Sequence, residues 1–262
     1  MSSQKVAVVT GGSSGIGAAT GAALAAQGWT VVLVARGAEA LRDVGDRIAA
    51  AGGHAVVEPL DASDGEAVVA MAERVTNTYG VPDAIVNSAG AGQWRFIEET
   101  PPAMAEQMMS APYFAAYNTT HAFMVPMLER RRGVIVHVGS PASLGPWPGA
   151  TAYTAARWAL RGLHEALRQD LIGTGLHSCH VMFSIVSSAY FDTNEVTDDV
   201  LPPLGKRIPP ISPRECAEII VRTIAKPRPQ VLHPPALRRL YRQYQLMPAI
   251  GRRAVAWGAR RH

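Results

Sequence analysis

The sequence lacks the features that mark secreted, disulfide-stabilised and membrane-spanning proteins. Its 262 residues contain only two cysteines, Cys179 and Cys216, which cannot form a disulfide framework. No uninterrupted apolar run approaches the roughly 20 residues that a membrane span requires. The chain passes from a short polar start into a strand-like run at residues 6–9, without the pattern of a signal peptide. We therefore expect a soluble, cytoplasmic protein, and we predict no metal site.

Lysine is scarce throughout the chain, and acidic residues are missing near its C-terminus. Lysine occurs only at Lys5, Lys206 and Lys226, and no Asp or Glu follows Glu218. Apolar residues and arginines are interleaved over residues 227–262, which predicts a basic amphipathic extension. This extension suits packing across a dimer interface, packing over the substrate cleft, or peripheral contact with an anionic membrane. No nucleic-acid-binding signature accompanies the arginines, so we expect no nucleic-acid partner.

Strand-like and helix-like segments alternate along the rest of the chain. Runs of β-branched and apolar residues predict buried parallel strands at residues 5–10, 28–35, 54–60, 83–86, 134–140 and 178–186. Helices are predicted between and after them, ending near residue 27 and covering 38–51, 63–79, 113–131, 153–172 and 215–225. This alternation predicts one α/β domain over residues 1–226, a Rossmann-type doubly wound parallel sheet with helices on both faces. Residues 91–104 are predicted to be a loop, Pro112 to start a helix, and residues 187–212 to form a lid.

A glycine-rich stretch, Thr10 to Gly17, lies between the first predicted strand and the first predicted helix. Glycines permit a tight turn and a close approach of the backbone to a ligand. The N-terminus of the following helix offers free N–H groups and a positive dipole end to a pyrophosphate. A strand before and a helix after are the context that a dinucleotide site requires. We therefore expect cofactor contacts from Gly11, Ser13, Ser14, Gly15, Ile16 and Gly17.

The residue at the end of the second predicted strand bears on which dinucleotide is bound. An acidic residue about 20 positions after the glycines holds a ribose 2′-hydroxyl, whereas an arginine accommodates a 2′-phosphate. Arg36 occupies this place, which favours NADP(H), with NAD(H) as the alternative. The competing interpretation is that Arg36 is a solvated loop cation. Two later strand ends are also predicted to contact the cofactor, through Asp61 and Ala62 and through Asn87, Ala89 and Gly90.

Three polar side chains are predicted to converge beside the cofactor. Ser140 ends a buried strand, and Tyr153 and Arg157 lie four residues apart on one face of a predicted helix. A hydroxyl, a phenol and a fixed cation at one cleft suit proton transfer, because the cation favours the phenolate. Taken singly, Ser140 also suits a helix cap and Tyr153 a half-buried core position.

Together these residues resemble the short-chain dehydrogenase/reductase family over about residues 4–225. The stretch Thr10–Gly17, the element Asn87–Gly90, Ser140, and Tyr153 thirteen residues later match jointly in order and spacing. The resemblance implies hydride transfer between a nicotinamide and a carbonyl or alcohol. It assigns Ser140 to the substrate oxygen and Tyr153 to proton transfer, and it implies a homodimer or homotetramer.

The chain departs from the family pattern at three places. Arg157 replaces the family lysine, and Pro112 stands where an asparagine usually holds a water of the proton relay. Arginine keeps the charge but does not titrate in a useful range. Ser188 and Ala189 replace the usual Pro-Gly, whereas Thr193 matches the family threonine that contacts the nicotinamide amide.

Two hypotheses follow from this pattern. The first is an NADP(H)-dependent oxidoreductase acting on a carbonyl compound or secondary alcohol. Aromatic residues near the expected cleft predict that this substrate is apolar: Trp94, Phe96, Trp147, Tyr190 and Phe191. The second hypothesis is a dinucleotide-binding sensor or scaffold with impaired catalysis, which the replacements at Arg157 and Pro112 suggest.

Overall fold

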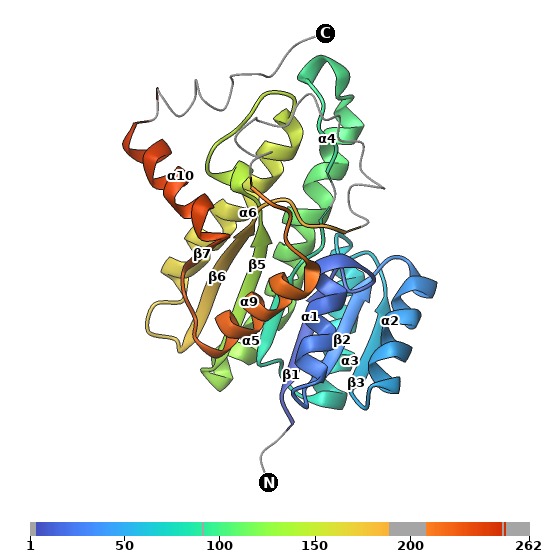
Figure 1. Cartoon of the computed structure of the whole chain (residues 1–262). Coiled ribbons are helices and arrows are strands. Elements are labelled where there is room, and N and C mark those ends of the chain that lie inside the picture. The colour runs from blue at the N-terminus through green and yellow to red at the C-terminus, as the bar shows by residue number, and fades with distance from the viewer. Residues whose placement is uncertain (1–3, 91, 189–207, 248, 250–262) are drawn as a thin grey trace.

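Seven parallel strands form the sheet that positions every other element (Figure 1). A computed structural model of the protein describes residues 4–90, 92–188, 208–247 and 249. The strand order is β3-β2-β1-β4-β5-β6-β7, so the direction of winding reverses between β1 and β4. The predicted doubly wound Rossmann-type sheet is therefore confirmed. The strands are β1 (Val6–Thr10), β2 (Thr30–Ala35), β3 (His54–Pro59), β4 (Ala84–Asn87), β5 (Gly133–Gly139), β6 (Leu176–Phe183) and β7 (Gln230–His233).

Helices cover both faces of the sheet, as Figure 1 shows. The helices are α1 (Gly15–Ala25), α2 (Ala38–Ala50), α3 (Gly65–Tyr79), α4 (Pro102–Met109), α5 (Ala115–Arg130), α6 (Thr151–Asp170), α9 (Pro213–Ala225) and α10 (Pro235–Leu246). Alternate residues of a strand point to opposite faces. Ala7 and Val9 of β1 thus pack with α1, α2 and α9, whereas Val6 and Val8 pack with α3, α5 and α6. The five central strands are buried on both sides, which explains their continuous hydrophobic runs, whereas the edge strands β3 and β7 are only partly buried.

The region before α5 differs from the predicted loop and helix start. Residues Ile97–Glu99 form a 3₁₀ turn, and α4 begins at Pro102, within the last three residues of the predicted loop. Pro112 does not start a helix: it lies inside a π-helical turn, Ser110–Phe114, that joins α4 directly to α5. Proline lacks a backbone N–H and collides with the preceding helical turn, and a wider turn accommodates both defects.

The C-terminal segment contributes to the sheet and does not only extend from it. β7 pairs in parallel with β6, with His180 opposite Gln230 and Phe183 opposite His233. The expected boundary at residue 226 therefore places one strand of the sheet in the predicted extension. Of the predicted lid, residues 189–207 lie outside the described residues, and its flanks are joined where the Ser187 N–H donates to the Ile211 carbonyl at 2.9 Å. Among the described helices, none is long and apolar enough to cross a membrane.

Three fully buried histidines form a cluster on the sheet face that α5 and α6 cover. His137 of β5 and His180 of β6 are strand partners, and His164 of α6 packs on them, with ring centroids 6.0 and 5.4 Å away. Burial, together with the nearby His164, lowers the pKa of His137 to about 3. Burial also lowers the pKa of His164 to about 4, and that of His180 well below its ordinary value. The histidine cluster is therefore neutral at physiological pH.

The depressed pKa values make the fold sensitive to acid. Between about pH 6.5 and pH 4 the unfolded chain binds protons at His137 and His164 while the folded chain does not. Stability consequently rises with pH across this window and is lost as the pH falls, by up to about 1.4 kcal/mol per pH unit for each histidine. We expect His137→Gln to reduce the change of unfolding free energy with pH by about the contribution of one histidine. Urea unfolding at pH 5 and pH 7 measures this change. An unchanged slope would show that His137 is already protonated in the fold.

Candidate active site

A cavity of about 940 Å³ opens at the C-terminal ends of the strands, on both sides of the reversal between β1 and β4. This is the position where open α/β sheets bind ligands. The structure brings most of the predicted site residues to its wall: Gly11, Ser13, Ser14, Gly15, Ile16, Gly17, Arg36, Asp61, Ala62, Ala89, Gly90, Ser140, Tyr153 and Arg157. Asn87 does not line it, and Thr193 lies outside the described residues.

The glycine turn is closed by contacts that leave no room for side chains. A Cβ atom on Gly17 would lie 2.1 Å from the Gly11 carbonyl oxygen, and Gly11 itself has a φ of +69°. The Thr10 hydroxyl accepts hydrogen bonds of 3.1 Å from the N–H groups of Ser88 and Ala89, which ties the end of β4 to the turn. The first turn of α1 carries no acidic residue, and the Ser14 side chain does not cap it. The N–H groups at the start of α1 are therefore available to bind an external anion.

Arg36 and Asp61 lie next to each other at the cavity wall, just beyond the ends of β2 and β3. Their charged atoms are 3.9 Å apart, and their side chains are 78% and 48% exposed. Burial raises the pKa of Asp61, but hydrogen bonds from the Ser63 N–H and hydroxyl and the nearby Arg36 outweigh it, so the net shift is downward. An exposed pair of this kind contributes little, about 0–1 kcal/mol. A doubly charged phosphate can therefore compete with Asp61 for the Arg36 guanidinium.

Asn87 has a structural position instead of the predicted cofactor contact. Its side-chain amide donates to the Thr120 hydroxyl of α5 at 3.1 Å and lies 3.3 Å from the His137 Nδ1. The reason is strand alternation: Ile85 packs on the α5 side of the sheet, and Asn87, two residues later, points the same way. The cofactor wall at this strand end is formed by Ser88, Ala89 and Gly90 instead.

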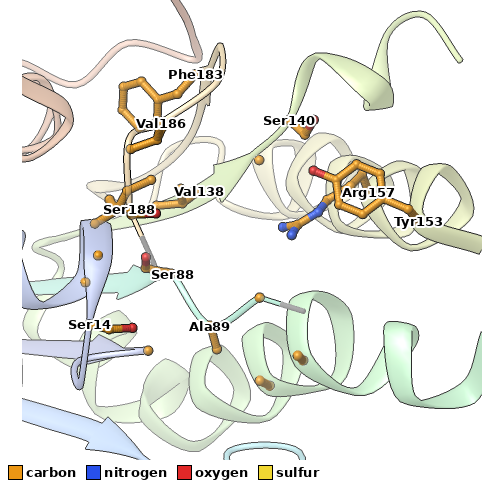
Figure 2. A pocket seen from close by; sticks show the side chains of 18 of the residues that line it. Ser14, Ser88, Ala89, Val138, Ser140, Tyr153, Arg157, Phe183, Val186 and Ser188 are labelled. Atoms are coloured by element: carbon orange, nitrogen blue, oxygen red, sulfur yellow. The ribbon is translucent and has the colours of Figure 1, made fainter. Parts of the chain in front are cut away.

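Ser140, Tyr153 and Arg157 meet at the other side of the cavity. Figure 2 shows the Tyr153 hydroxyl beside Ser140, with the Arg157 guanidinium directed from α6 into the cavity. The guanidinium carbon lies 4.9 Å from the centre of the Tyr153 ring. A Cβ atom on Gly90 would be 2.9 Å from an Arg157 terminal nitrogen, so the glycine makes room for the bulkier cation. The three predicted groups therefore converge on one wall.

Ser140 also has the capping role that the sequence left open. Its hydroxyl oxygen accepts a hydrogen bond of 3.2 Å from the Ala142 N–H, at the start of a 3₁₀ turn, Pro141–Ser143. The Ser143 hydroxyl donates to the Ser140 carbonyl at 2.7 Å. Capping uses one lone pair of the hydroxyl and leaves its proton and second lone pair free to contact a substrate. The capping hydrogen bond thus fixes the position of Ser140 and leaves its hydroxyl able to bind a substrate.

Aromatic rings form the wall around Tyr153. Trp94 packs 5.8 Å from the Tyr153 ring and 5.2 Å from Trp147, and all three line the cavity. Phe96 packs against this cluster without lining the cavity. Tyr190 and Phe191 lie outside the described residues. The part of the cavity beyond Ser140 and Tyr153 is therefore largely apolar.

Part of the wall comes from α10, in the segment for which packing over the substrate cleft was one of the predicted alternatives. Leu237, Tyr241 and Tyr244 line the cavity, and the Tyr241 hydroxyl donates to the carbonyl of Pro141, next to Ser140. These residues stand at i, i+4 and i+7, a spacing that places them on one helix face. In the sequence, this apolar stripe indicates that one face of the helix is buried, as packing over the cleft requires. Gln107, Ser110 and Ala111, from α4 and the π-helical turn, complete this side.

Comparison with known proteins agrees with this geometry. A family model for short chain dehydrogenase matches residues 5–199. The probable oxidoreductase EphD of Mycobacterium tuberculosis is 35% identical over 189 residues, which make up 72% of this chain but only 31% of that protein. A metagenomic short-chain oxidoreductase solved in complex with NADP is 29% identical, with a TM-score of 0.75 over 88% of this chain and 97% of the other. A short-chain dehydrogenase/reductase from Burkholderia phymatum, solved in complex with NAD, shares the fold with a TM-score of 0.84 at 24% identity, over 95% of each chain.

These similarities define the class of the protein. The chain belongs to the short-chain dehydrogenase family, whose members are oxidoreductases that act with NAD(P). The predicted resemblance is thereby confirmed.

Proposed function

We propose that the protein is an NADP(H)-dependent oxidoreductase that interconverts an apolar carbonyl compound and the corresponding secondary alcohol. One observation carries this proposal: the glycine turn and the Ser140–Tyr153–Arg157 group line a single cavity. The residues present fit a pyridine dinucleotide, because Gly11 and Gly17 permit close backbone approach and the start of α1 carries no competing anion. The turnover of NADPH with a panel of ketones of increasing size, followed by loss of NADPH absorbance, tests the proposal.

The bound cofactor supplies the hydride, and the side chains of this chain handle the substrate and its proton. The Ser140 hydroxyl donates to the substrate oxygen and orients it. Tyr153 gives its phenolic proton to that oxygen during reduction and takes it back during oxidation. The Arg157 guanidinium lies over the Tyr153 ring, so a positive charge stands beside the group that gives up the proton. The low exposure of Tyr153, 7%, keeps water from competing for this proton.

The preference for NADP(H) rests on Arg36. The guanidinium is exposed at the cavity wall and its pair with Asp61 is weak, so a 2′-phosphate can gain a charge-assisted bidentate contact. NAD(H), which lacks this phosphate, remains the alternative cofactor. The neighbouring family structure in complex with NADP is consistent with this choice.

Replacing Arg36 by serine is expected to weaken NADPH binding by about 10- to 100-fold, the loss of one hydrogen-bonded charge pair of about 1.5–3 kcal/mol. NADH binding is expected to stay within a few fold, because no 2′-phosphate is present. Fluorescence titration with both cofactors measures the two affinities. Asp61→Asn is the matched control and is expected to strengthen NADPH binding, since it removes the competing carboxylate. An equal loss of affinity for NADPH and NADH would show that Arg36 does not bind the 2′-phosphate.

A dinucleotide-binding sensor or scaffold is the second candidate function. It rests on the buried Arg157, because a guanidinium does not deprotonate, and on Pro112, which brings no side-chain donor to the turn between α4 and α5. The similarity to oxidoreductases does not favour it. Arg157→Lys distinguishes the two functions. An impaired enzyme is expected to gain turnover with this variant, whereas a scaffold binds NADPH and gains none. Turnover in the unchanged protein would exclude the scaffold directly.

The remaining features belong to the same proposal. Thr193 is proposed to contact the nicotinamide amide, and the segment 187–212 to act as a lid. Assembly as a homodimer or homotetramer is supported by exposed apolar side chains in the π-helical turn, α5 and α6, namely Phe114, Tyr117, Val125 and Trp158. Light scattering measures the oligomeric state. Peripheral membrane contact through the C-terminal segment is a weaker proposal, supported by exposed Leu246 and Met247 beside the arginines of α10 and tested by vesicle sedimentation.

A further inference from the structure

The histidine cluster belongs to a polar row that crosses the middle of the sheet. Asn87 of β4, His137 of β5 and His180 of β6 occupy the same register position on three adjacent strands. All three point to the face covered by α5 and α6, where His164 of α6 packs on the two histidines. Most positions of this layer are apolar, and a row of polar side chains in it is costly unless it is hydrogen-bonded.

Several ring nitrogens of the cluster have no protein partner. Within the described part of the chain, the His137 Nε2, the His164 Nε2 and both ring nitrogens of His180 are buried without a hydrogen bond. Each such group costs about 1–3 kcal/mol when it stays unsatisfied. Grouped buried polar atoms of this kind are the usual binding site of internal water, which needs two to four polar partners. The cluster meets that condition.

At one end of the histidine cluster, His180 packs beside the strand end that carries Ser140. A Cβ atom on Gly139 would lie 2.0 Å from the His180 Nε2, so this ring packs directly on the backbone of Gly139. Gly139 lines the large cavity and immediately precedes Ser140. Burial lowers the pKa of His180, and the positive charge of Arg157 adds to this effect. His180 thus packs against the end of β5 that leads into Ser140 and the site of proton transfer.

At the other end of the histidine cluster, His164 contacts a residue that lines a second cavity. The His164 Nδ1 lies 2.9 Å from the Ser178 hydroxyl oxygen. Ser178 lines a separate cavity of about 280 Å³, together with Arg168, His177 and Arg228. Ser178 lies near the start of β6, and His180 and Met182 follow it on the same face. The small cavity therefore lies at the N-terminal end of β6, whereas the reaction centre lies at the C-terminal ends of the strands.

We propose that Ser178, His164 and His180, bridged by internal water, form a proton route from the small cavity to Tyr153. The inference rests on the proposed function, because each carbonyl reduced removes one proton from the Tyr153 phenol. That proton must be replaced from solvent, and Arg157 cannot supply it since a guanidinium does not deprotonate. A neutral imidazole can take up a proton at one nitrogen as it releases one from the other. One proton enters at Ser178 and one reaches Tyr153 in each turnover.

Burial is the main cause that keeps the histidines in the neutral form that such a route needs, and most of the nearby charges act in the same direction. Arg161 and Arg168 of α6 oppose protonation of His164, and only Glu165 favours it. Arg157 and Arg161 oppose protonation of His180. No charged residue from β4 or β5 lies among the groups that shift these histidines. The route therefore passes a proton without storing charge in the core.

Three variants of equal burial separate a proton route from simple core damage. His180→Leu and His164→Leu interrupt the route, whereas His137→Leu removes a neighbour that lies beside it. We expect the first two to lower kcat at least about tenfold, to increase the solvent deuterium isotope effect on kcat, and to leave NADPH affinity unchanged. His137→Leu is expected to change kcat only a few fold. Equal losses in all three variants, without a larger solvent isotope effect, would contradict the route.

A second measurement does not depend on turnover. The ring N–H protons of His164 and His180, followed by NMR of ¹⁵N-histidine-labelled protein, are expected to exchange with water through Ser178. Ser178→Ala is expected to slow this exchange at least about tenfold, because it removes the hydroxyl that relays the protons, and Ser178→Thr is expected to restore it. Unchanged exchange in Ser178→Ala overturns the route. Slowed exchange in a protein without NADPH turnover would uphold the water path and reject the proposed oxidoreductase function instead.

Discussion

Replacing Tyr153 by phenylalanine is expected to lower the turnover of NADPH with a carbonyl substrate by about 10²- to 10⁴-fold, the usual contribution of a positioned general acid. The variant keeps the ring that packs against Trp94 and Trp147 and under the Arg157 guanidinium. It removes only the hydroxyl that faces Ser140 (Figure 2). Stability and NADPH affinity are therefore expected to remain close to those of the unchanged protein.

The matched control for this experiment is Tyr244→Phe. Tyr244 also lines the cavity, from α10, but it stands outside the Ser140–Tyr153–Arg157 group. Its loss is expected to change KM for large substrates and to leave kcat within a few fold. Full activity in Tyr153→Phe, or an equal loss of kcat in both variants, would show that the phenol of Tyr153 is not the proton donor.

Replacing Gly17 by alanine is expected to produce the second large effect. The added Cβ would meet the Gly11 carbonyl oxygen at 2.1 Å, and backbone cannot move aside as a flexible side chain can. Relieving this clash shifts the start of α1 away from the glycine turn and costs about 1–3 kcal/mol of stability. Since the same N–H groups are proposed to hold the pyrophosphate, we expect NADPH affinity to fall about a hundredfold, or roughly 2.8 kcal/mol.

Gly162→Ala on α6 is the control for Gly17→Ala. No atom lies within 4 Å of the position of its added Cβ, and alanine favours a helix over glycine by about 0.5–1 kcal/mol. We therefore expect this variant to be slightly more stable and to bind NADPH normally. Thermal unfolding and fluorescence titration measure both properties. Normal NADPH binding by a folded Gly17→Ala variant would place the cofactor away from the glycine turn.

Much of the site could be predicted because short sequence stretches impose it locally. The glycine stretch lies between a strand and a helix, so its place at the sheet edge follows from the chain order. Tyr153 and Arg157 share a helix face by their spacing alone. Their position beside Ser140 follows from the resemblance to a family, and the structure brings the three together at one wall of the cavity.

The parts that could not be predicted depend on packing between distant segments. Pro112 lies inside a π-helical turn because α4 precedes it, and α4 begins within a stretch that was predicted to be a loop. The assignment of Asn87 to the cofactor failed to apply strand alternation, which turns this side chain toward Thr120. The same alternation at 135, 137 and 139 and at 178, 180 and 182 was available in the sequence, and it predicts the row that contains His137 and His180.

The substrate wall shows the limit of local reasoning most clearly. Leu237, Tyr241 and Tyr244 come from a segment about 100 residues after Ser140, and the hydrogen bond from Tyr241 to Pro141 spans a separation of 100 residues. The helical stripe on α10 indicates that one face is buried, but not against which element. Only the pairing of β7 with β6 brings α10 back over the cavity.

The most direct measurement is a crystal structure of the protein in complex with NADPH. We expect the pyrophosphate at the Gly11–Gly17 turn, the 2′-phosphate at Arg36, and the nicotinamide ring beside the Tyr153 hydroxyl. A nicotinamide ring placed far from Tyr153, with the dinucleotide otherwise bound, would contradict the oxidoreductase function and leave only a nucleotide-binding protein.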